Sequence, residues 1–389
     1  MKDIKPTQKI EFANSLRGIA VLMVLLGHYI FVFNALKGKY SGFPALDYYP
    51  YPWAFSILSP FPINQVNVGQ IAVALFFLIS GLVIPNSTAS LGNKKGGQIA
   101  FIIGRLLRIW PTYIVGLTVS VSALWFNSYI NSSTFNITFA QIISNMTIFR
   151  DWLGQSHIDG IIWTLEIEVK FYIFVLLFWK DIREGKLYPI AIITIIACIL
   201  APMGANFDVT NDPTLTISNF IWTAPYLMYM SMGILFNYHY RKMIDTKTLL
   251  ASISAIALAF VYTAKTQALY IQVPASYIST LCVFTFLYFF AKEWTGGPAI
   301  RFFAKISYPL YVSHAALGYT GIAFMISRGL SPMISLILQI AISTAVAFII
   351  HILVENPTHN LGKRLGKLFI KRNEIQKSDP STIKVTADS

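Results

Sequence analysis

The chain has 389 residues, of which 55% are hydrophobic and only 12% are charged. A soluble globular domain carries about 25% charged residues, so this composition excludes an ordinary soluble protein and predicts an all-α, polytopic membrane protein. The formal net charge of +13 would suit a nucleic-acid-binding protein, but the basic residues lie where the topology of a membrane protein places them.

Ten apolar segments are candidate membrane spans. They lie near residues 16–36, 68–85, 102–124, 161–179, 188–203, 219–237, 248–264, 275–291, 301–325 and 333–354. The sequence therefore predicts about ten transmembrane helices in one membrane-embedded domain, residues 1–360. Residues 361–389 are basic and then polar, and we expect them to form a disordered cytoplasmic tail.

The 30 lysines and arginines are unevenly distributed among the segments that connect these spans. With the N-terminus in the cytoplasm, the cytoplasmic segments hold 24 of them and Lys170 falls within a span. The outer segments hold five, namely Lys37, Lys39, Arg150, Lys265 and Arg328. This asymmetry follows the positive-inside rule, and it predicts an even number of spans in the cytoplasmic (inner) membrane with both termini cytoplasmic. No nucleic-acid partner is needed to explain the charge.

The first span contains two ionisable residues, Arg17 and His28, in the otherwise apolar run LRGIAVLMVLLGHYIFVF. On an α-helix they lie roughly 16 Å apart along the axis and about 20° apart around it, so both face the same side. If Arg17 is at the membrane edge, His28 is near mid-bilayer, where an ionisable residue is costly and indicates a functional site. A hydrogen bond to a neighbouring helix for the histidine, and headgroup contacts for the arginine, are the structural alternatives.

The second and third spans add two features. Ser80-Gly81, in LFFLISGLVIP, permits a close approach of another helix. Arg105 and Arg108, in RLLRIWPTY, share one helix face at the cytoplasmic end. Two adjacent guanidinium groups suit a phosphate or pyrophosphate ligand, whereas the structural alternative is anchoring to lipid headgroups.

The fourth span begins WTLEIEVKFY and carries Glu166, Glu168 and Lys170 within five residues. Such a density of charge indicates either function or an internal ion pair that holds helices together. Glu166 and Glu168 are about 200° apart on a helix and cannot face the same site, and Lys170 is a poor intrahelical partner for Glu168.

The last two spans carry further ionisable residues. His314, in YPLYVSH, lies at a depth similar to that of His28. Glu355, in VENP, follows the tenth span one turn after His351. A structural role before the proline turn is an equal alternative for Glu355.

Six of these stretches, in order, resemble the acyltransferase-3 family of integral membrane O-acyltransferases, which modify cell-surface sugars. They are SLRGIAVLMVLLGH, LFFLISGLVI, RLLRIWPTY, WTLEIEVKFY, YPLYVSH and VENP, and they extend over residues 15–357. The fourth motif keeps Trp163, Leu165, Glu168, Phe171 and Tyr172 of the family pattern. It departs from the pattern with Thr164 in place of Ser and Lys170 where Gln is common.

The resemblance implies transfer of an acyl group, usually acetyl, from acyl-CoA as co-substrate to a hydroxyl of a carbohydrate or glycolipid acceptor, within the lipid bilayer. It assigns catalysis to His28, whose proton affinity suits a general base near pH 7. We expect Glu168 to orient the acceptor from the outer side. Tyr308, His314 and Glu355 are expected to be supporting residues.

The cofactor-binding prediction is that Arg17, Arg105 and Arg108 grip the CoA phosphates at the inner face. No metal site is expected. A secondary transporter or flippase that uses intramembrane His, Glu and Lys residues is the alternative function, although the sequence does not show the repeated halves typical of transporters.

Overall fold

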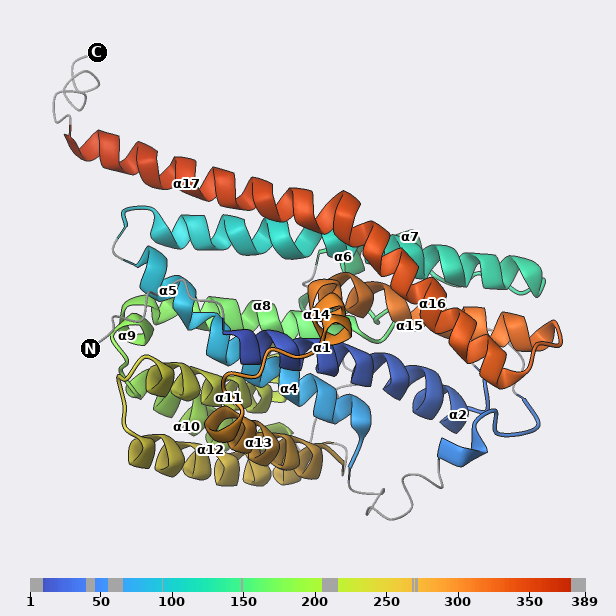
Figure 1. Ribbon diagram of the computed structural model, residues 1–389, viewed down its shortest axis with the longest axis horizontal. Coiled ribbons are helices and arrows are strands. Elements are labelled where there is room, and N and C mark those ends of the chain that lie inside the picture. The colour runs from blue at the N-terminus through green and yellow to red at the C-terminus, as the bar shows by residue number, and fades with distance from the viewer. Residues whose placement is uncertain are drawn as a thin grey trace.

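A computed structural model of the protein describes residues 10–39, 46–54, 66–92, 94–147, 150–204, 216–267, 269 and 272–378. Every regular element in these ranges is helical, which confirms the all-α prediction. Long helices lie side by side along the long axis of the molecule, with α1 in the middle of the bundle (Figure 1).

The helices are numbered in chain order, and η marks a π- or 3₁₀-helical turn. The first half contains α1 (Glu11–Leu26), η1 (Gly27–Val32), α2 (Phe33–Ala35), α4 (Val68–Val83), α5 (Pro85–Leu91), α6 (Gly97–Ile130), α7 (Phe139–Met146), η2 (Arg150–Leu153) and α8 (Ile162–Leu177). The second half contains α9 (Trp179–Arg183), α10 (Tyr188–Gly204), α11 (Thr216–Tyr240), α12 (Thr246–Thr266), α13 (Gln272–Phe290), α14 (Pro298–Lys305), α15 (Ser307–Ser327), α16 (Pro332–Ile350), η3 (His351–Glu355) and α17 (Asn356–Ser378).

Seven helices in the described ranges are long and apolar enough to cross a membrane. All ten predicted spans fall on helical segments, but α8 and α10 have only 16 and 17 residues, and α11 does not reach the same apolarity. The predicted count of about ten is therefore approximate. Large apolar side chains such as Leu177, Leu258 and Phe290 are more than 70% exposed, as the surface of an integral membrane protein in contact with lipid requires.

The predicted ninth span, residues 301–325, is not one helix. It is divided at Ile306 into α14 and α15, because Pro309 lacks the N–H that would bond to the carbonyl of Lys305 and its ring would collide with that carbonyl. The turn at Ile306 leaves Arg301 on a short amphipathic helix and starts a new, deeply buried helix that carries His314.

The predicted boundary at residue 360 also differs from the structure, because α17 continues as a helix to Ser378. Gly362 and Gly366 allow α17 to pack closely along α6, where a Cβ at either glycine would meet atoms of that helix. The packing supplies the stability that a basic sequence lacks on its own. The remaining predicted tail, residues 379–389, lies outside the described residues.

Glycine pairs bring other helices together as well. Gly81 of α4 and Gly233 of α11 face each other so closely that a Cβ on either would collide with the partner's backbone. The predicted close helix approach at Ser80-Gly81 is thus confirmed. Gly18 of α1 similarly meets the carbonyl of Ile300 in α14. These crossings fix α1 between α4 and the α14–α15 corner, and so they set the position of Arg17 and His28.

Candidate active site

His28 stands on a π-helical turn. The α-helical geometry of α1 ends at Leu26, and residues Gly27–Val32 form the wider turn η1. Single π-turns within helices are rare and are frequent at functional sites. The imidazole is half-buried and stacks on the ring of Tyr319, with centroids 5.9 Å apart and planes 15° apart. The backbone irregularity therefore coincides with the one ionisable side chain at mid-helix.

His28 is hydrogen-bonded to the second buried histidine, His314. The distance from Nδ1 of His28 to Nε2 of His314 is 3.1 Å, although the residues belong to η1 and α15, which are far apart in the sequence. Nδ1 of His314 lies 2.8 Å from the carbonyl oxygen of Tyr311, which can only accept, so this nitrogen carries a proton. Nε2 of neutral His314 is then an acceptor, and the hydrogen-bond network assigns the donor role to Nδ1–H of His28. Nε2 of His28 is left with its lone pair.

Tyr29 holds the two histidine-bearing helices in register. Its hydroxyl donates to the carbonyl oxygen of His314 at 2.9 Å and is also bonded to Ser343 Oγ at 2.7 Å. Gly318 makes room for the tyrosine, because a Cβ at that position would overlap the Tyr29 ring. Helices α1, α15 and α16 are thereby fixed around the histidine pair.

A partly open cavity of about 130 Å³ lies between five helices, on the side of the histidine pair that the positive-inside prediction places toward the cytoplasm. Its lining includes five of the predicted site residues: Arg17, Arg105, Arg108, Glu168 and Tyr308. Tyr311 closes one end, and its ring lies 6.0 Å from that of His314. Neither histidine lines the cavity. His314 lies next to Tyr311, and His28 lies on the other side of His314.

The three arginines of the cavity are only partly satisfied by the protein. Arg105 donates to Ser87 Oγ at 3.1 Å and lies over the rings of Phe101 and Tyr172. In the described part of the chain, Arg17 and Arg108 form neither a hydrogen bond nor an ion pair. All three arginines are half-buried, and unpaired guanidinium groups in a partly enclosed cavity suit an anionic ligand.

Glu168 is the only carboxylate in the lining of this cavity. It accepts a hydrogen bond from the Tyr172 hydroxyl and interacts electrostatically with Arg17 and Arg105, without a direct ion pair to either in the described residues. One carboxylate among three guanidinium groups leaves the cavity with a net positive charge.

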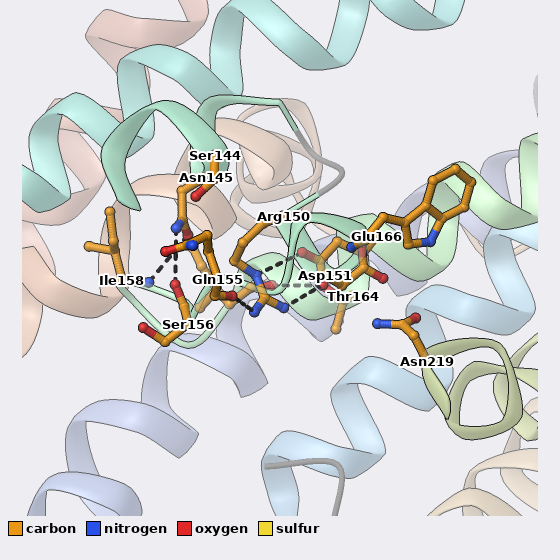
Figure 2. Close-up of polar contacts among 12 residues, drawn as sticks. Ser144, Asn145, Arg150, Asp151, Gln155, Ser156, Ile158, Thr164, Glu166 and Asn219 are labelled. Atoms are coloured by element: carbon orange, nitrogen blue, oxygen red, sulfur yellow. Dashed lines mark hydrogen bonds and ion pairs between the residues drawn. The ribbon is translucent and has the colours of Figure 1, made fainter. Parts of the chain in front are cut away.

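Glu166 and Lys170 point away from the cavity, to the opposite side of α8. Glu166 accepts two hydrogen bonds of 2.9 Å from Nε and Nη2 of Arg150, which Figure 2 shows reaching toward it. Lys170 pairs with Asp151 and donates to Asn219 at 2.7 Å. The internal ion-pair interpretation thus holds for Glu166 and Lys170, whereas Glu168 faces the cavity as the helical periodicity predicted.

The segment that supplies these partners folds back against the bundle. Tyr113 of α6 donates to the carbonyl oxygen of Asn145 at 2.9 Å, and the Asn145 side chain binds Ser156 and Ile158 (Figure 2). Arg150 is only 13% exposed and is therefore not an ordinary loop residue. Sequence reasoning did not single out Arg150, Asp151 or Asn219 as partners of the α8 charges, because no local pattern links them to that helix.

Asp159 is a further buried carboxylate that sequence reasoning missed. It lies before α8, is 3% exposed, and accepts from Ser120 Oγ at 3.2 Å and from the Ile161 amide at 3.2 Å. Burial raises its pKa to about 6, more than these two hydrogen bonds lower it. A single aspartate in a loop gives no signal that would predict this.

The supporting residues occupy different places. Tyr308 lines the cavity and donates to the carbonyl oxygen of Ile109 at 2.9 Å. Glu355 lies on the π-turn η3, paired with Nδ1 of His351 at 2.6 Å, and does not line the cavity. The position of Glu355 near Pro357 fits the structural alternative, although its carboxylate also interacts electrostatically with Tyr308.

Two observations concern possible metal or thiol chemistry. Within the described ranges no group of three or more His, Cys, Asp or Glu side chains is arranged to hold a metal ion. Cys198 and Cys282 are free cysteines on separate helices.

Comparisons with known proteins agree with the geometry. Residues 10–355 match the sequence model of a family described as an acyltransferase domain, the acyltransferase-3 type. A curated relative, Nodulation protein 10 of Rhizobium leguminosarum bv. viciae, is 24% identical over 207 residues, which cover 49% of this chain and 52% of that protein. The match therefore spans about half the length of the relative. No solved structure matches.

Proposed function

The chain belongs to the acyltransferase-3 family, and from that premise we propose that it moves an acetyl group from cytoplasmic acetyl-CoA to a hydroxyl of a cell-surface or exported carbohydrate. The observation that carries this proposal is a cavity with a single carboxylate in its lining, in which Arg17 and Arg108 have no hydrogen-bond or ion-pair partner among the residues that the structure describes. Such a site needs a multiply charged anion, and the diphosphate of CoA supplies one.

The distance between the arginines and the histidines suits the length of this donor. Arg17 and His28 are separated by roughly 16 Å along the helix axis. The pantetheine arm of CoA is an extended chain of comparable length between its diphosphate and its thioester. With the diphosphate on the guanidinium groups, the thioester carbonyl reaches the end of the cavity at Tyr311, next to the histidine pair.

His28 acts as the general base. Its Nε2 takes the proton of the acceptor hydroxyl while the hydroxyl oxygen attacks the thioester carbonyl carbon. The resulting tetrahedral intermediate expels the CoA thiolate, which receives the proton from His28 and leaves as the thiol. Nδ1–H of His28 continues to donate to His314 throughout, so His314 keeps the ring in the productive tautomer and orientation.

Glu168 has a role on the acceptor side. A carboxylate surrounded by Tyr172, Tyr308 and Tyr311 resembles the combination of hydrogen-bond acceptor and aromatic surface that suits a sugar. Thr164 also lines the cavity. Its hydroxyl donates to the carbonyl oxygen of Ile161, and it can therefore only accept the hydrogen bond from the Tyr311 hydroxyl. The departure from Ser to Thr in the family motif thus keeps the hydroxyl that this contact requires.

Two experiments test the proposal. Purified protein in lipid nanodiscs should transfer labelled acetyl from acetyl-CoA to isolated surface glycans, and mass spectrometry should find a missing acetyl group on the glycans of a deletion strain. A protein that neither binds nor cleaves acetyl-CoA, in a strain whose glycans are unchanged, would contradict it. Transport of an unmodified solute would instead support the transporter alternative.

A further inference from the structure

Helix α17 packs beside the cavity arginines of α6, although none of its residues lines the cavity itself. This helix follows η3 without interruption and runs back along α6, as Figure 1 shows. Gly362 lies against Leu107 and Gly104, and Gly366 lies against Ala100. The face of α17 that precedes Gly362 is therefore beside the turn of α6 that carries Arg108.

His359 occupies that face. Its ring is half-buried, and Nδ1 is shielded from solvent with no hydrogen-bond partner in the described part of the protein. Among the described residues, the charged groups that act on the ring are Arg108, Lys363 and Arg105, all of them basic. A polar atom buried without a partner among three cations indicates a missing anionic ligand.

Lys363 lies one turn farther along α17 and is exposed. It shares a helix face with His359, because residues four apart are neighbours on a helix surface. Along α6, His359 is therefore level with Arg108, and Lys363 is one turn closer to the N-terminal end of α6, which the positive-inside prediction places in the cytoplasm. The cavity extends in the other direction, to Tyr311.

We propose that His359 and Lys363 form an outer phosphate subsite that binds the 3′-phosphate of the CoA ribose, while Arg17, Arg105 and Arg108 bind the diphosphate. The inference rests on the proposed function and specifies which part of the donor each group of side chains recognises. The 3′-phosphate is on the ribose, on the far side of the diphosphate from the thioester, and the subsite lies beside Arg108 and outside the cavity lining that leads to Tyr311. A phosphate monoester on an anionic lipid has the same chemistry, so the test must separate the two sources.

The experiment compares acetyl-CoA with acetyl-dephospho-CoA, which lacks only the 3′-phosphate. Charge-assisted hydrogen bonds to phosphate contribute enough that wild-type protein in neutral-lipid nanodiscs should show a KM about tenfold higher for the dephospho donor. In His359→Gln and Lys363→Ala the ratio of the two KM values should fall toward one. Arg364→Ala is the matched control, because Arg364 is an exposed residue of α17 about 140° around the helix from His359, and its ratio should remain that of wild type.

Equal KM values for the two donors in wild-type protein would overturn the inference, even if transfer from both is efficient and the proposed function stands. A ratio unchanged by both α17 substitutions would also overturn it. A wild-type ratio that appears only in neutral nanodiscs and disappears with anionic lipid would show that lipid headgroups compete for the subsite, and would assign the site to lipid. Absence of any transfer from acetyl-CoA would instead refute the proposed function itself.

Discussion

Nδ1 of His28 and Nε2 of His314 lie 3.1 Å apart, joining the π-turn η1 to α15 across 286 residues of sequence. Because the other nitrogen of His314 is committed to the Tyr311 carbonyl, the pair has one defined arrangement of protons. A base whose ring is held by a second residue is the arrangement found in nucleophile–base–orienter systems.

The histidine pair predicts a specific pattern of substitution effects. His28→Ala should lower kcat for transfer by roughly 10²–10⁴-fold, the range for loss of a general base. His314→Leu should lower kcat with little change in donor affinity, and His314→Gln should recover part of the rate because its amide oxygen can accept from His28. The double variant should be no slower than His28→Ala alone, since residues that act as a unit are non-additive. Independent, multiplicative losses would show that the two residues do not work together.

Substitution of Glu166 should lower the stability of the protein, whereas substitution of Glu168 should lower its activity. Glu166→Gln removes one partner of the buried Arg150 pair, which typically costs about 3–5 kcal/mol, and should lower the unfolding temperature of the purified protein. Glu168→Gln should leave that temperature nearly unchanged and raise KM for the carbohydrate acceptor. Donor affinity should not fall in Glu168→Gln, because the substitution makes the cavity more positive. If both variants lose stability and activity alike, the assignment of the two faces of α8 is wrong.

The helical periodicity of the sequence was sufficient to place Glu168 and Glu166 on opposite faces and to group Arg105 with Arg108. It could not identify the partners of Glu166 and Lys170, because Arg150 and Asp151 reach them through a loop that folds back by tertiary contacts with α6. The same limit applies to His28 and His314, whose contact depends on how two distant helices cross. The π-turn at Gly27–Val32 was also invisible in the sequence, since its apolar residues suit an ordinary helix equally well.

Asp159 predicts a pH dependence of stability. Its pKa is raised by burial from 3.8 to about 6, so in the folded protein it keeps a proton that the unfolded chain releases between these values. Stability therefore falls as pH rises through this window, and above pH 6 the full cost, of order 1–3 kcal/mol, is present. Asp159→Asn should remove this cost and unfold at a higher temperature than wild type at pH 7.5, with a smaller difference at pH 5.

A control for this measurement is Asp245→Asn. The pKa of Asp245 is lowered, first by hydrogen bonds from Thr248 at the start of α12, so the residue is ionised throughout the range from pH 5 to 8. Its substitution should leave the pH dependence unaltered. An Asp159→Asn curve parallel to that of wild type would contradict the burial argument.

The topology remains a prediction that α6 makes easy to test. Its 34 residues extend about 51 Å, more than the roughly 30 Å hydrocarbon core, so its two ends must lie on opposite sides of the membrane. In a variant with Cys198 and Cys282 replaced by alanine, Ser133→Cys should react with an impermeant maleimide in intact cells, whereas Lys95→Cys should react only after lysis. The reverse labelling would place the termini outside and overturn the positive-inside orientation.

The clamp of three arginines on the donor phosphates is the central claim, and a titration of purified protein with acetyl-CoA tests it most directly. Lysine keeps the positive charge but cannot form the two-pronged contact of a guanidinium, so Arg105→Lys and Arg108→Lys should each weaken acetyl-CoA binding about tenfold or more. Arg301→Lys is the matched control, because Arg301 is an exposed arginine of α14 outside the cavity, and its affinity should equal that of wild type. Wild-type donor affinity and turnover in both Arg105→Lys and Arg108→Lys would contradict the account. Arg105 and Arg108 would then have only the structural role of anchoring the helix to lipid headgroups.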